Sequence, residues 1–246
     1  MKPIVAAALL PHPPILLPEV GKGEERVIHQ TKESMEEVAR RFGKKEADTL
    51  ILISPHGALF RDTITTIDEE ILEGDLARFG APQVQIRYET DQQFVRELYE
   101  LCYEKEFPLL LLDEKLAGEY GLSTTLDHGA MVPLYYMESI WKKRPKLVYI
   151  NYGLLPPEDL SFFGHLLEAT LKKLGRKALI IASGDLSHRL SDEGSYGFQQ
   201  EGPLFDEEIQ RILGEGTLDD LLQIPEDFSE KAGECGLRSF MIMAGV

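Results

Sequence analysis

The chain has 246 residues, which is enough for one large domain with a substantial core. Its composition, 43% hydrophobic and 28% charged, excludes a disordered chain and is typical of a globular protein. With 26 basic and 42 acidic side chains, the net charge is −16 at pH 7. That charge argues against nucleic acid or an anionic membrane as partner, because both select a basic face.

The two cysteines, Cys102 and Cys235, are too few for a disulfide scaffold, so we expect a cytoplasmic location. Cys102 falls on the apolar face of a predicted helix and is assigned to the core. No segment is apolar over the roughly 20 residues that a membrane span needs. The apolar run Ile4–Leu10 is too short for a signal peptide and lacks a small-residue cleavage site.

Strands and helices are predicted to alternate along the chain. The strands are Ile4–Leu10, Thr49–Ser54, Thr63–Ile67, Val84–Tyr88, Pro108–Leu112, Lys146–Ile150 and Ala178–Ala182. The helices are Gly23–Phe42, Asp91 to about Cys102, one from Pro133, one from Pro156, Pro203–Leu213, Leu218–Gln223 and one from Leu237. This alternation predicts the α/β class, with a mainly parallel sheet covered by helices on both faces.

We expect a single domain over residues 1–246, because no repeat or linker interrupts the chain. The apolar character continues to Val246, which predicts a further C-terminal element. Three local expectations are specific. Val27 points inward, an acidic turn covers Glu69–Gly80, and Ser191–Gly202 is a long loop or lid.

Three histidines follow predicted strands. His12 comes after the first strand, just before a double proline that forbids helix; His56 follows the second; and His188 follows Ala178–Ala182. Parallel strands bring their carboxyl ends to one edge, so these histidines should meet there, with His12 and His56 at neighbouring strand ends. Imidazole is the commonest metal ligand and titrates near neutral pH, so we predict a metal site or an acid/base site.

Two other histidines, His29 and His165, fall off the apolar faces of their helices and are predicted to be solvent-exposed. His128 is predicted to lie on a loop before the helix that starts at Pro133, since proline favours the first helical turn.

A third metal ligand is needed beside two histidines. Glu234, between Gly233 and Gly236, is the best candidate, because two histidines and one carboxylate form the facial site of non-haem Fe(II) oxygenases. The alternative is that Glu234 only serves the start of a helix, where the helix dipole favours an acidic residue.

Five short motifs together resemble the class III extradiol ring-cleavage dioxygenases, the LigB superfamily. They are Leu10-Pro11-His12-Pro13-Pro14, Ser54-Pro55-His56-Gly57, Asp127-His128-Gly129, Ser183-Gly184-Asp185-Leu186-Ser187-His188 and Ala232-Gly233-Glu234-Cys235-Gly236. The order and spacing are closer to the LigB-like branch associated with the AMMECR1 and Memo proteins than to the protocatechuate enzymes.

The resemblance implies a LigB-like fold and a ferrous ion held by His12, His56 and Glu234. It also implies that His188 is the catalytic acid/base and that His128 contacts substrate or bound oxygen. The implied reaction is ring cleavage of a small catecholic or related aromatic substrate with incorporation of both atoms of O2.

Other readings stay open at this point. A Cys235 thiolate ligand would favour zinc or another use of iron. With zinc, the protein would be a hydrolase with His188 as general base. A Memo-like metal-binding interaction protein without turnover is a third reading. We expect a homo-oligomer, because symmetric dimers are the commonest assemblies. The resemblance to the protocatechuate type also leaves room for a small partner subunit.

Overall fold

The computed structural model describes residues 2–246 and contains, among them, eight strands and nine α-helices. The strands are β1 (Ile4–Leu10), β2 (Thr49–Ser54), β3 (Ile64–Ile67), β4 (Ile71–Leu76), β5 (Ala81–Glu89), β6 (Leu109–Leu112), β7 (Lys146–Asn151) and β8 (Ala178–Ser183). The α-helices are α1 (Pro18–Gly21), α2 (His29–Phe42), α3 (Gln92–Glu104), α4 (Glu114–Glu119), α5 (His128–Met137), α6 (Pro157–Leu174), α7 (Glu201–Glu215), α8 (Glu226–Ala232) and α9 (Leu237–Ala244). The 3-10 helices are η1 (Pro14–Leu16), η2 (Glu24–Ile28), η3 (Ala77–Phe79) and η4 (Leu218–Gln223).

Six strands form one sheet in the order β1-β8-β2-β7-β3-β6. All neighbours are parallel except β3, which runs antiparallel to β7. The strands β2 and β8 are buried along their whole length, and their sequences are almost continuously apolar. That pattern arises because a parallel sheet is covered on both faces. The prediction of a mainly parallel sheet is confirmed.

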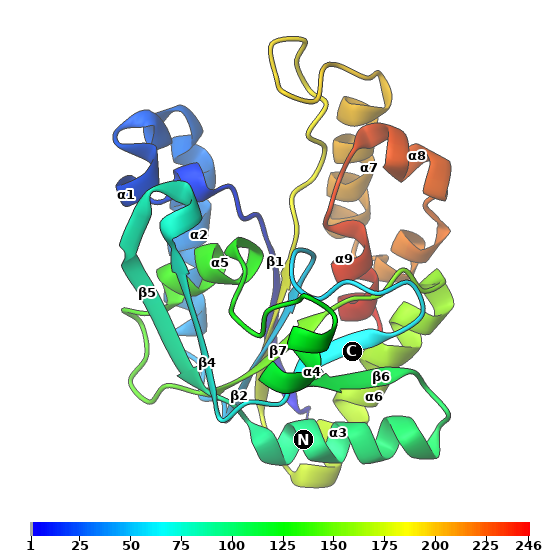
Figure 1. Ribbon diagram of the computed structural model, residues 1–246. Coiled ribbons are helices and arrows are strands. Elements are labelled where there is room, and N and C mark those ends of the chain that lie inside the picture. The colour runs from blue at the N-terminus through cyan, green and yellow to red at the C-terminus, as the bar shows by residue number, and fades with distance from the viewer. Residues whose placement is uncertain (1) are drawn as a thin grey trace.

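The sheet separates two hydrophobic cores. Alternate residues of β2 face opposite sides, so Ile51 and Ile53 pack with α3, α6, α7 and α9, whereas Leu50 and Leu52 pack with α2, α5 and the β4–β5 hairpin. Figure 1 shows these two groups of helices on either side of the sheet. The predicted helices on both faces are therefore present.

The predicted acidic turn over Glu69–Gly80 is wrong. Its central part is β4, which pairs antiparallel with β5 and buries Leu72 and Leu76. The acidic residues of β4 point to the exposed side of the hairpin, so charge concealed a period-two apolar pattern. The turn itself is η3, closed by Gly80 with a φ of 76°.

The predicted helix from Gly23 to Phe42 is also corrected, because it divides into η2 and α2. At Ile28 the backbone leaves helical geometry, with φ −113° and ψ 34°. The apolar face of α2 therefore does not extend into η2, and Val27 is 83% exposed instead of pointing inward.

Helix α5 begins five residues earlier than predicted, at His128 instead of Pro133. Asp127 caps this helix by accepting the backbone N–H of Ala130 at 2.9 Å, which is the usual role of Asp at a helix start. Pro133 then lies inside the helix, where it has no N–H to donate to the carbonyl of Gly129. His128 is thus the first helical residue and not a loop residue.

Candidate metal centre

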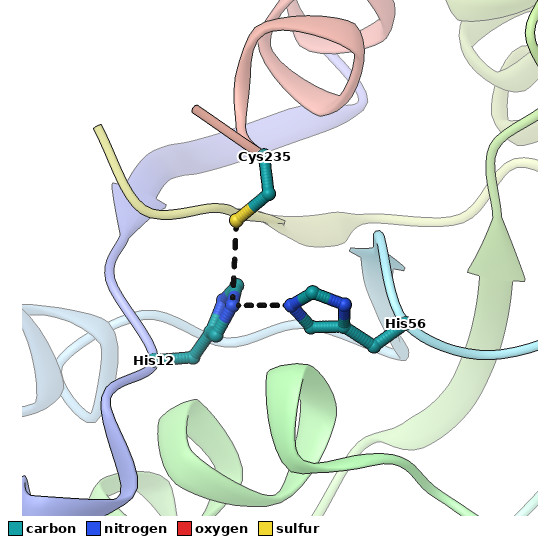
Figure 2. A group of neighbouring side chains, drawn as sticks. All are labelled: His12, His56 and Cys235. Atoms are coloured by element: carbon teal, nitrogen blue, oxygen red, sulfur yellow. Dashed lines mark hydrogen bonds between the residues drawn. The ribbon is translucent and has the colours of Figure 1, made fainter. Parts of the chain in front are cut away.

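Two imidazoles meet at the carboxyl edge of the sheet. His12 follows β1 and His56 follows β2, and their Nε2 atoms lie 2.9 Å apart (Figure 2). The strands are not neighbours as expected, because β8 is inserted between them. The two loops nevertheless converge over the end of β8, since all three strands are parallel.

The thiol of Cys235 completes this group. Its Sγ lies 3.6 Å from Nε2 of His12, and the ligand atoms of His12, His56 and Cys235 all lie within 4.8 Å of one another. Figure 2 shows the sulfur and His56 approaching the same nitrogen of His12 from two sides. The pKa of the thiol is raised by burial, which disfavours the thiolate until a cation is present.

Backbone contact between two loops sets the position of Cys235. The N–H of Cys235 donates to the carbonyl of Asp185 at 3.3 Å, and the N–H of Asp185 donates to the Cys235 sulfur at 3.3 Å. A Cβ on Gly184 would lie 2.0 Å from Cα of Gly236, so glycine is required for this approach. The loop after β8 and the start of α9 are therefore held together at the site.

Glu234, predicted as the third ligand, is not in this group. Its Oε2 accepts the backbone N–H of Leu237 at 2.6 Å, so the carboxylate serves the first turn of α9. Burial raises the pKa of this carboxyl group. The structure places a thiol where the sequence predicted a carboxylate, because the free N–H groups of a helix start attract the acidic side chain. A Glu234–metal bond stays a prediction without support from this geometry.

His188 lies in a second cluster, with Asp185 and Cys235. Its Nδ1 is 2.5 Å from the carbonyl of Gly233, which only accepts, so Nδ1 carries a hydrogen. Its Nε2 faces the Asp185 carboxylate at 3.4 Å. The hydrogen bonds to Asp185 and Cys235 raise the pKa of His188 to about 11. Without metal, His188 is therefore an imidazolium at neutral pH.

Burial has the opposite effect on the other histidines. His12 is 1% exposed, and desolvation outweighs the attraction of Asp185 and lowers the pKa of His12 to about 4. Burial also lowers the pKa values of His56 and His128. These three imidazoles are neutral at pH 7, which is the form that binds metals.

His128 stacks on His56, with ring centroids 4.4 Å apart and planes at 13°. The ring of Phe79, in η3, lies 5.2 Å from the His128 ring, with the planes tilted at 53°. Asp127, directly before His128, accepts hydrogen bonds from the hydroxyls of Ser54 and Tyr149 at 2.7 and 2.6 Å. The start of α5 is thus held against the ends of β2 and β7.

The segment predicted as a loop or lid, Ser191–Gly202, is irregular up to the start of α7 at Glu201. Tyr196 of this segment stacks on the ring of His188 at 5.0 Å. As predicted, His29 and His165 are exposed and contact none of the four clustered histidines.

Sequence reasoning included two residues of the site, Ser183 and Asp127, in its motifs but assigned them no role. Oγ of Ser183 lies 2.9 Å from Nδ1 of His12, and Asp127 caps the helix that carries His128. Both are polar residues at the end of a buried element. Their position beside a histidine motif was the available signal.

A cavity of about 930 Å³ lies at the opposite, amino-terminal edge of the sheet and is lined by many lysines, among them Lys44, Lys45, Lys142 and Lys177. Helices α2 and α6 end here, at Gly43 and Gly175. Cations near helix C-termini are stabilised by the helix dipole, which accounts for this basic lining without a ligand.

The donor set of the site suits a first-row transition metal. Two neutral imidazole nitrogens and a thiol can converge on one cation, and both ligand types bind iron and zinc. The set differs from the two-histidine, one-carboxylate arrangement by its softer sulfur ligand.

Comparison with known proteins agrees with the fold and the motifs. Residues 6–246 match the family model described as the catalytic LigB subunit of aromatic ring-opening dioxygenase. The chain is 38% identical over 237 residues to "Protein CA_C1420" of Clostridium acetobutylicum, a match that covers 96% of this chain and 50% of that protein. The chain therefore spans about half the length of this curated relative.

Among solved structures, the uncharacterized protein JW3007 from Escherichia coli K12 superimposes with a TM-score of 0.57. The two are 16% identical, and the match covers 85% of this chain and 81% of that one, which shows a shared fold. No helix among residues 2–246 is long and apolar enough to cross a membrane.

Proposed function

The chain belongs to the LigB family, named for the catalytic subunit of aromatic ring-opening dioxygenases, and from this membership we propose that it is a metal-dependent extradiol dioxygenase. Its substrate would be a small catecholic or related aromatic compound, cleaved beside the diol with both atoms of O2 entering the product. The observation that carries the proposal is the convergence of His12, His56 and Cys235 beside two further histidines at one sheet edge.

His12, His56 and Cys235 would hold the metal, which we propose to be Fe(II). A bound ferrous ion would supply one-electron chemistry toward O2 and Lewis acidity toward the diol. His12 is buried whereas His56 is exposed, so a substrate would reach the site from the side of His56.

His188 would move the protons. Its Nδ1–H is fixed on the carbonyl of Gly233, so only Nε2 can exchange a proton with a substrate. Asp185 holds that proton on Nε2 at neutral pH, which suits His188 to donate a proton to an oxygen of the opening ring. After this donation His188 would be neutral, and uptake of a proton from a substrate hydroxyl or from solvent would restore its acid form.

His128 and the aromatic rings beside the histidines would position the substrate. The neutral His128 ring stacks on His56, with Phe79 behind it, and Tyr196 covers His188. These flat ring surfaces favour a planar aromatic molecule, since aromatic rings pack well in offset or tilted arrangements.

The test is an anaerobic titration of Fe(II)-loaded protein with a panel of catechols, followed by admission of 18O2. We expect one O2 consumed per ring opened and two labelled oxygen atoms in the product. The matched control is the Zn(II)-loaded protein, which should bind catechols without consuming oxygen. Stoichiometric Fe(II) binding without oxygen uptake across the panel would contradict the dioxygenase proposal.

One observation favours a second candidate, a zinc-dependent hydrolase on the same site. The sulfur of Cys235 is a softer ligand than the predicted carboxylate, and sites with cysteine and histidine often hold zinc. Anaerobic purification followed by metal analysis distinguishes the dioxygenase from the hydrolase. A zinc hydrolase would retain zinc and would not exchange it for added Fe(II).

A further inference from the structure

The buried hydroxyl of Ser183 lies within hydrogen-bond distance of two polar groups. One is the backbone carbonyl of Gly129, 2.5 Å from Oγ, and the other is Nδ1 of His12, 2.9 Å from Oγ. Ser183 is fully buried, so water cannot take the place of either contact.

The carbonyl of Gly129 needs this partner because of Pro133. In an α-helix the carbonyl of residue 129 would accept from the N–H of residue 133, and proline has none. A buried carbonyl without a partner is costly, and the Ser183 hydroxyl supplies the missing donor.

The direction of both hydrogen bonds then follows from counting hydrogens. A hydroxyl has one hydrogen and a carbonyl only accepts, so the Ser183 hydrogen points to Gly129. The oxygen of Ser183 is left to accept, and the hydrogen in the second contact must belong to Nδ1 of His12.

We infer that Ser183 is a positioning residue that fixes His12 as the Nδ1–H tautomer and so keeps the Nε2 lone pair free for a metal. Nε2 is the atom that faces His56 at 2.9 Å and Cys235 at 3.6 Å. In the other tautomer, Nε2–H would point into the site and block coordination. This inference rests on the proposed metal site and extends it to Ser183, Gly129 and Pro133.

The placement is built into the fold. Ser183 is the last residue of β8 and pairs with Leu10 of β1, two residues before His12. The N–H of Gly184 donates to the carbonyl of Leu10 at 3.0 Å, which fixes the two strand ends. The N–H of His12 donates to Asp185 at 2.8 Å, so backbone and ring are held from the same loop.

The first measurement uses metal-free wild-type protein labelled with 15N-histidine, at pH 7.5. The ring resonances of His12, assigned by comparison with His12→Gln, should report the Nδ1–H tautomer. An Nε2–H tautomer in the wild type would overturn the inference without any variant.

The second measurement compares Ser183→Ala with Ser239→Ala. Ser239 is equally buried and its hydroxyl has no partner among the described residues, so it is a matched control for loss of a buried hydroxyl. We expect Ser183→Ala to give mixed His12 tautomers and to weaken binding of Zn2+, and of Fe2+ under anaerobic conditions, by about 10–100-fold, as for other residues that orient a ligand. Ser239→Ala should match the wild type in both respects.

Ser183→Thr retains the hydroxyl and should restore the tautomer and the affinity. If Ser183→Ala bound metal as tightly as Ser239→Ala, with an unchanged tautomer, Ser183 would have a structural role only and the inference would fall. Absence of metal binding by the wild type would instead contradict the proposed function, while the tautomer measurement would still decide the role of Ser183.

Discussion

At the scale of single residues, four clustered histidines acquire different properties from their immediate contacts. His12 is buried and neutral, whereas His188 is held as an imidazolium by Asp185. Their two pKa values are displaced in opposite directions, which divides metal binding from proton transfer within one site. All four residues have the same side chain, so their different roles follow from their surroundings and not from residue type.

The variants Cys235→Ser and Glu234→Gln test which of these two residues is the third metal ligand. Cys235→Ser should weaken metal binding at least tenfold, because a soft sulfur donor is replaced by a poor hydroxyl ligand. Glu234→Gln should bind nearly as the wild type, since its side-chain oxygen can still accept the N–H of Leu237. Isothermal titration with Zn2+ measures both. The reverse order of effects would restore Glu234 as the ligand.

The role of His188 is tested by His188→Phe, with an active substrate in hand. Metal content should be retained, and turnover should fall by about 10²–10⁴-fold, the usual contribution of a general acid or base. The exposed His29→Gln is the control and should change neither. Loss of metal in His188→Phe as complete as in His12→Ala would make His188 a ligand.

At the scale of elements, the site depends on contacts between loops and helix starts that follow different strands. The loop after β8 contacts the start of α9 through two hydrogen bonds between Asp185 and Cys235. The start of α5 packs against the ends of β2 and β7 through Asp127. These contacts join segments that are far apart in the sequence.

Gly184→Ala tests this contact between loops. The added Cβ would lie 2.0 Å from Cα of Gly236, and backbone cannot move aside as a flexible side chain can. We expect a loss of about 1–3 kcal/mol in the free energy of unfolding, as for overpacked sites, together with weaker metal binding. Urea denaturation and metal titration measure the two effects. The control is Gly214→Ala in α7, where no atom lies within 4 Å of the added group.

At the scale of the whole molecule, one sheet with a core on each face carries the site at one edge and a basic surface at the other. Because His12 is buried by this architecture, its protonation is coupled to global unfolding. The metal-free protein should therefore lose stability on acidification.

The coupling has a definite sign for His12. Its pKa is about 4 in the folded protein and near 6.5 in the unfolded chain, so the unfolded chain binds the proton first. The contribution of His12 is complete above pH 6.5 and is lost as the pH falls toward 4. Between pH 7.5 and 5 we expect about 2 kcal/mol from this residue.

Urea denaturation of chelator-treated wild type and His12→Gln at these two pH values measures the effect. The variant should lose about 2 kcal/mol less than the wild type. His188 acts in the opposite direction, since its raised pKa adds stability below pH 6.5 that is lost as the pH rises toward 11, and it cancels in the comparison. Equal losses in both proteins would show that His12 titrates alike in the folded and unfolded states.

Much of the fold could be predicted because its signals are local. The apolar runs of β1, β2 and β8 end at polar, proline-containing or glycine-containing segments, and each run is followed by a histidine. The failures were equally local. The acidic residues of β4 concealed its period-two pattern, and Asp127 started α5 before Pro133.

The sequence by itself determined the class of fold, the edge at which the site forms and three of its histidines, His12, His56 and His188, because strand ends and imidazoles can be read directly from the order of residues. Only the tertiary structure decided that Cys235 faces His12 while Glu234 serves α9, that β8 separates β1 from β2, and that Ser183 orients His12. Neighbouring residues at a helix start point in different directions, and which of them enters the site depends on a backbone contact with a segment about 50 residues away, the separation of Cys235 from Asp185. The local hydrophobic periodicity does not predict that contact, since it depends on how α9 packs against the end of β8.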